Sequence, residues 1–107
     1  MQTIIKSREH EVAPRFKEVI VKKTSKIKKH FPQAKTLEIE IHQENNPSIS
    51  EPTAVELTLS TKKQLMRAES RGESFMAALE KAVYKINRQV EKYKDRIYHS
   101  KINRKLQ

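Results

Sequence analysis

Apolar residues recur at two spacings along the chain, and the spacing predicts which segments are helices. The first helix is predicted to begin with Glu11-Val12-Ala13-Pro14, because proline suits the first helical position, and to end before Pro32, which disfavours helical angles at the preceding residue. Its apolar residues fall within an arc of about 120° at about 100° per residue, as expected of an amphipathic helix. They are Phe16, Val19, Ile20, Ile27 and Phe31.

Other segments alternate strictly between apolar and polar residues, which is typical of half-buried strands. Strands are predicted at 3–7, 37–42, 54–59 and, less regularly, 65–70. The turn-forming residues Asn45-Asn46-Pro47-Ser48 separate the second strand from the third. Three consecutive strands with short links favour an antiparallel meander.

A second, longer helix is predicted from about residue 74 to 97. Apolar residues from Phe75 to Ile97 step by threes and fours. Ser70-Arg71-Gly72-Glu73 has the spacing of a capping box, although Gly72 or Ser74 could equally be the N-cap. From Ser100 to Gln107 the periodicity is lost, so residues 99–107 are predicted to be a basic, flexible tail.

The order β-α-β-β-β-α predicts one α+β domain over residues 1–98, with a four-stranded mixed sheet. A right-handed crossover between parallel first strands would make the two helices run parallel on one sheet face. The opposite face would show Glu38, Glu40, His42 and Glu56 to solvent.

The net charge and its distribution along the chain indicate that the domain binds an anionic partner. The 107 residues include 23 Lys and Arg against 13 Asp and Glu, a net charge of +10, and no cysteine. Residues 13–31 carry +6 and residues 81–107 carry +7, whereas 36–60 carry −5. The absence of a membrane-length apolar run and of a secretory signal predicts a cytoplasmic protein that does not bind membranes.

The cations of both helices form rows. Each row spans an arc of at most about 80° and lies about 125° from the apolar arc of its helix, with the same sense of rotation. Like-charged neighbours on a helix repel, so phosphates are the expected compensation, and the two rows together are predicted to form one basic plateau. The predicted RNA-binding residues are Arg15, Lys22, Lys26, Lys29, Lys81, Lys85, Arg88, Lys92 and Arg96.

The usual devices for reading single strands are missing, which favours structured RNA as the partner. There is no aromatic RNA-recognition consensus and no tryptophan, and Gly72 alone cannot build a GxxG loop. A non-specific structured-RNA binder or RNA chaperone shares the same electrostatics and stays open as an alternative. A protein-binding module acting on transcription would predict binding that is insensitive to salt.

Catalysis is not expected. Glu38, Glu40, Glu56 and His42 would lie on a flat face without a pocket to perturb their pKa values. The four histidines, His10, His30, His42 and His99, have no metal-binding spacing. The sequence therefore predicts no enzyme, no cofactor, no metal site and no small-molecule substrate.

Two stretches resemble the ribosome hibernation-promoting factors and ribosome-associated inhibitors, also called sigma-54 modulation proteins. The first is Glu11-Val12-Ala13-Pro14 opening a helix that ends Ser25-Lys26-Ile27-Lys28-Lys29-His30-Phe31. The more specific second is Phe75-Met76-Ala77-Ala78-Leu79-Glu80, followed by Lys85-Ile86-Asn87-Arg88-Gln89-Val90-Glu91-Lys92-Tyr93-Lys94. The resemblance covers about residues 3–97.

The resemblance implies binding to small-subunit rRNA in the decoding channel, which blocks tRNA and mRNA and stores idle ribosomes under stress and in stationary phase. Ribosomal proteins are possible further contacts, and the protein is expected to be a monomer off the ribosome. A basic rather than acidic C-terminus, and too little chain for a dimerising second domain, leave open whether it promotes ribosome dimers or only inhibits. The positions that match the family's rRNA-facing residues are Lys22, Lys26, Lys29, Lys81, Lys85, Arg88 and Lys92.

Overall fold

The predicted order of elements is confirmed. The computed structural model describes residues 1–7, 12–44, 46 and 48–106, with side chains described as far as His99. Glu11 of the predicted helix entry, Asn45 and Pro47 of the predicted turn, His10 and Gln107 lie outside the described residues. The elements are β1 (Gln2–Ser7), α1 (Pro14–His30), β2 (Thr36–Gln43), β3 (Thr53–Ser60), β4 (Leu65–Gly72) and α2 (Phe75–Leu106).

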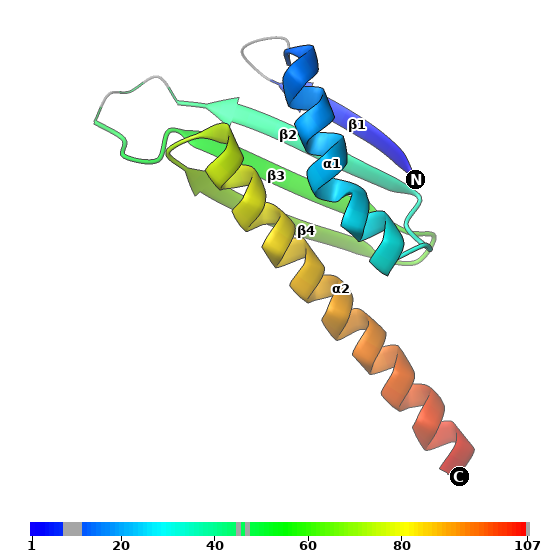
Figure 1. Ribbon diagram of the computed structural model, residues 1–107. Helices are drawn as coiled ribbons and strands as arrows, with labels where there is room; N and C mark the ends of the chain where they lie inside the picture. Colours follow the sequence, from blue (N-terminus) through cyan, green and yellow to red (C-terminus); the bar gives the residue numbers. More distant parts are fainter. Residues whose placement is uncertain (8–11, 45, 47, 107) are drawn as a thin grey trace.

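The strands form one mixed sheet in the order β1-β2-β3-β4. β1 pairs with β2 in parallel, whereas β2–β3 and β3–β4 are antiparallel, as the meander prediction required. Both helices lie on the same face of the sheet and run in the same direction, with α2 above β3 and β4 (Figure 1). The other face is left open.

The helix ends follow from local sequence. Pro14 occupies the start of α1, where a missing N–H costs no hydrogen bond. At the other end Phe31 donates its N–H to the carbonyl of Ile27, and Pro32 then prevents continuation. Of the possible caps for α2, Ser74 is the one used, because its hydroxyl accepts the N–H of Ala77 at 3.2 Å.

The core lies between the helices and the apolar face of the sheet. Gly72 is buried where the chain passes from β4 to α2, and a Cβ there would lie 2.6 Å from the backbone nitrogen of Ala78. Glycine is therefore required by close packing at this corner. The largest fully buried apolar residues are Ile20, Ile27, Phe31, Leu37, Ile39, Val55, Leu57, Leu59, Leu79, Ile86 and Val90.

Aromatic and polar contacts hold the two helices side by side. At one end the rings of Phe16 and Phe75 meet edge-on with centroids 5.3 Å apart. At the other, Phe31 and Tyr93 do the same at 5.6 Å. Between them, the ammonium of Lys23 lies 3.1 Å from a carboxylate oxygen of Glu80.

The second helix is longer than predicted. The expected end near residue 97 is wrong, because α2 continues to Leu106 and projects well past the end of the sheet (Figure 1). Apolar periodicity fails where the sheet ends, since no core remains to be covered. The residues beyond it include neither glycine nor proline, and Lys101, Arg104, Lys105 and Leu106 are good helix formers. The flexibility of residues 99–107 stays a prediction. No described helix is long and apolar enough to span a membrane.

Candidate nucleic-acid interface

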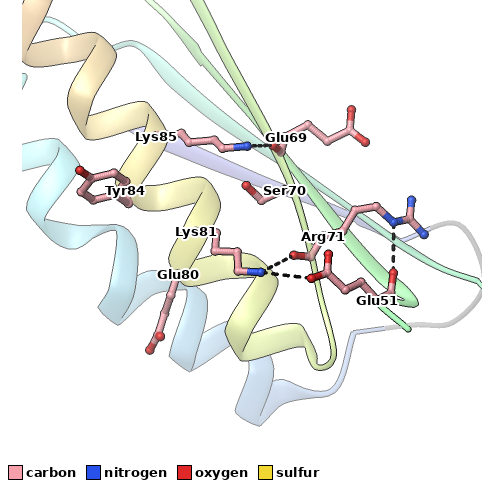
Figure 2. A pocket seen from close by; sticks show the side chains of 8 residues that line it. All are labelled: Glu51, Glu69, Ser70, Arg71, Glu80, Lys81, Tyr84 and Lys85. Atoms are coloured by element: carbon pink, nitrogen blue, oxygen red, sulfur yellow. Dashed lines mark hydrogen bonds and ion pairs between the residues drawn. The ribbon is translucent and has the colours of Figure 1, made fainter. Parts of the chain in front are cut away.

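The first two cations of the α2 row are held against the sheet. The ammonium of Lys81 donates to the carbonyl of Arg71 at 3.1 Å, and that of Lys85 donates to the carbonyl of Glu69 at 2.8 Å. Lys81 also lies 3.6 Å from a carboxylate oxygen of Glu51. Figure 2 shows both side chains reaching from α2 to β4. We call Lys81 and Lys85 the seated lysines.

These contacts follow from the position of β4 at the edge of the sheet. The outward carbonyls of an edge strand have no neighbouring strand, and covering them protects the edge from unwanted pairing. Gln89 extends the series by donating to the carbonyl of Arg67. Both seated lysines remain exposed, and an ammonium has three N–H donors, so each keeps donors for an outside anion.

The rest of the α2 row behaves differently. Arg88, Lys92 and Arg96 are exposed and make no hydrogen bond or ion pair with any side chain or backbone group in the described part of the chain. We call them the free cations. No ion pair offsets their charge within the described residues, so these side chains are available to a partner.

The α1 row consists of Arg15, Lys22, Lys26 and Lys29, all exposed. The guanidinium carbon of Arg15 lies 5.0 Å from the ring centroid of Phe16, a cation–π distance. The three lysines make no ion pair among the described residues. Lys23 follows Lys22 in the sequence and faces α2, because it pairs with Glu80. Helical geometry then places the α1 row on the side of α1 toward α2, but further from the sheet than Lys23.

That the two rows act together as one basic plateau stays a prediction. The α2 row lies on the flank of α2 that faces β4, away from α1. Between the rows runs the outer surface of α2, where helical geometry puts Glu80, Tyr84, Glu91 and Asp95.

The open face of the sheet has the opposite charge. Glu40, Glu56 and Glu69 are in register across β2, β3 and β4, so three carboxylates lie side by side. Glu38, on the same face, pairs with Lys6 at 2.7 Å. The hydrogen bond with Glu38 is the main reason that the pKa of Lys6 is raised above its usual value, and electrostatic attraction to the same carboxylate is the second. As predicted for this face, Glu38, Glu40, Glu56 and His42 are only half-buried.

Sequence reasoning did not single out two parts of this surface. Glu69 joins the acidic face only through the β3–β4 register, which the irregular pattern of the last strand concealed. Lys35, Lys62 and Lys63 lie in loops, where no periodicity identifies a common side. Nothing suggests a metal centre in the described residues, because no group of three His, Asp or Glu side chains converges there.

Comparison with known proteins gives the chain its relatives. A profile described as "Sigma 54 modulation protein / S30EA ribosomal protein" matches residues 3–98. Among curated proteins no relative matches.

Two solved structures have a similar fold. A ribosomal subunit interface protein from Coxiella burnetii is 16% identical with a TM-score of 0.78, covering 89% of this chain and 99% of that one. The Protein Y N-terminal domain from Thermus thermophilus is 16% identical with a TM-score of 0.74, covering 87% and 99%. At this identity they establish the fold alone. The family match covers most of the sequence, and the chain belongs to the sigma-54 modulation protein / S30EA ribosomal protein family, whose members are ribosome-associated proteins.

Proposed function

We propose that this protein is a ribosome hibernation factor that binds rRNA of the small ribosomal subunit in the decoding channel. Bound there, it excludes tRNA and mRNA and keeps idle ribosomes from translating. It acts in the cytoplasm and without catalysis, by occupying space rather than by changing a bond.

The observation that carries the proposal is the row of free cations on α2. Arg88, Lys92 and Arg96 have no described partner, whereas a row of like charges costs a helix a few tenths of a kcal/mol per neighbouring pair. Phosphates offset that repulsion. Charge segregation supports the same orientation, because the acidic open face would be repelled by RNA while the helical face is attracted.

Two separate rows suit a folded RNA better than an extended strand. Each row follows one helix, and the helices run side by side, so each row can follow a different stretch of sugar-phosphate backbone. Helix-borne lysines and arginines contact phosphates by shape and charge, without reading bases.

Reversing the free cations tests the proposal. Because Arg88→Glu/Lys92→Glu/Arg96→Glu replaces three phosphate contacts by repulsion, we expect it to abolish co-sedimentation with small ribosomal subunits at physiological salt while leaving the circular dichroism spectrum unchanged. The matched control is Lys17→Glu/Lys28→Glu/Arg67→Glu, which makes the same change in net charge at exposed residues outside both rows. Full binding by the first variant, or equal loss by both, would contradict the proposal.

Competition separates this function from general RNA binding, which the same charges would also allow. Purified subunits are saturated with the protein, and an excess of an unrelated structured RNA is added before sedimentation. A ribosome-specific factor stays with the subunit. Release by the competitor would favour a non-specific RNA chaperone instead.

A further inference from the structure

At the end of the sheet from which α2 projects there is an open pocket that the two rows do not include. It holds about 530 Å³, within the range of about 300–1,000 Å³ found for small-ligand sites. It is formed by the N-terminus, the loop between α1 and β2, the turn between β3 and β4, and the middle of α2. It is lined by Met1, Pro32, Gln33, Ala34, Lys35, Thr61, Lys62, Lys63 and Tyr93. We call it the lysine pocket.

The lining combines two kinds of surface. Lys35, Lys62 and Lys63 supply three positive charges, and no described residue lining the pocket is an aspartate or glutamate. Pro32 and Tyr93 belong to an apolar wall. A ligand that fits both surfaces has an anionic group joined to a flat or apolar body, which is the chemistry of a nucleotide.

The pocket is held in shape before any ligand arrives. The hydroxyl of Thr61 accepts the backbone N–H groups of Lys63 at 3.2 Å and Gln64 at 2.9 Å, which fixes the tight turn that carries two of the lysines. On the other side, the ring of Tyr93 is packed edge-on against buried Phe31. Because the Thr61 turn and the Tyr93 ring are already ordered, binding of a ligand costs less conformational entropy.

The lysines of this pocket are also available. Lys35, Lys62 and Lys63 are exposed and make no ion pair or side-chain hydrogen bond in the part of the chain that is described. The groove between α2 and β4 is the counter-example. There Glu51 lies beside Lys81, and both seated lysines already donate to β4.

We propose that the lysine pocket binds one unpaired nucleotide of RNA, with its phosphate on Lys35, Lys62 and Lys63 and its ribose or base against Tyr93. The proposal rests on RNA being the partner, as in the proposed function, and adds a place where a single-stranded residue is held beside the folded RNA that the rows contact. Aromatic walls with flanking cations are a common way of holding single-stranded nucleotides.

The test is an amide chemical-shift titration of the ¹⁵N-labelled full chain with the 5′-phosphorylated dinucleotide pUpU. We expect shifts at residues 33–35, 61–64 and 93. In Lys62→Gln/Lys63→Gln, pUpU should bind about tenfold more weakly or worse, because charge-assisted contacts to the phosphate are lost. In the control Lys17→Gln/Arg67→Gln, which has the same net charge, affinity should change less than about twofold.

Three results would overturn the proposal: shifts confined to the two helix rows, equal weakening in both variants, or uridine, which has no phosphate, binding as tightly as pUpU. The last would show that the three lysines do not hold a phosphate. Failure here is distinguishable from failure of the proposed function, since the pocket is intact in Arg88→Glu/Lys92→Glu/Arg96→Glu. If that variant binds pUpU and still sediments with subunits, the proposed function fails while the assignment of the pocket stands.

Discussion

The two parts of the α2 row both carry cations at helical spacing, but their surroundings differ. The seated lysines, Lys81 and Lys85, lie above β4 and donate to its outer carbonyls. The free cations, Arg88, Lys92 and Arg96, find no such acceptor in the described structure. One row can therefore contribute to the fold at one end and be reserved for a partner at the other.

This difference separates stability from binding along a single helix. Substitutions near the start of α2 should affect folding and binding together. Substitutions further along should affect binding alone. The variants below test that division, from the largest expected effect to the smallest.

The largest difference between the two parts of α2 is expected in how much stability is lost when a buried or an exposed isoleucine is truncated. Ile86 is fully buried, and Ile86→Ala should lower the free energy of unfolding by about 2–5 kcal/mol, because it removes buried surface and leaves a cavity. Ile97 is 37% exposed, so Ile97→Ala should lower the free energy of unfolding by less than about 1 kcal/mol. Urea denaturation of both variants measures the two values. Similar losses would mean that the projecting part of α2 is as much a part of the cooperative fold as the seated part.

A pair of lysine variants tests the charged row directly. Lys85→Ala removes a donor to the carbonyl of Glu69 and should lower the free energy of unfolding by about 0.5–1 kcal/mol, a value reduced by its exposure to water. Lys92→Ala removes no such contact and should change it by less than about 0.5 kcal/mol. Thermal unfolding measures this difference in stability. Affinity for the subunit is measured as well, and we expect both variants to bind more weakly than the wild-type protein. Equal stability of the two variants would remove the distinction between seated and free cations.

The smallest effect is expected on the other face of the sheet. Glu56 lies between Glu40 and Glu69 in register, and directly opposed like charges destabilise a sheet by about 0.2–1 kcal/mol. Glu56→Gln should therefore raise the melting temperature slightly, whereas Glu73→Gln, an exposed control outside the sheet, should not. An unchanged or lower melting temperature for Glu56→Gln would show that this face is not under electrostatic strain. Subunit binding should be unaffected in both variants.

The sequence was sufficient to predict the fold because apolar spacing and covered surface coincide. Leu37, Ile39, Val55, Leu57 and Leu59 alternate in the sequence and are buried in the structure. The parallel arrangement of the helices followed from the crossover between the first two strands. The family resemblance pointed to the same fold.

Relations between elements could not be predicted in the same way. The contacts of Lys81 and Lys85 with β4 depend on which strand forms the sheet edge beneath α2. The separation of the rows depends on how the helices are turned toward each other. The lysine pocket joins Lys35 to Lys62 across two loops, and the end of α2 lies beyond the core whose periodicity indicated the helix.

The most direct test of the central claim, that free cations on the helical face bind phosphates, is the salt dependence of binding to purified small ribosomal subunits. Each neutralised phosphate contributes about 0.7–0.9 to the slope of log affinity against log salt. We predict that Arg88→Gln/Lys92→Gln/Arg96→Gln lowers that slope by about 2–3, whereas Lys17→Gln/Lys28→Gln/Arg67→Gln leaves it unchanged. Identical slopes for the wild-type protein and the free-cation variant would contradict the account.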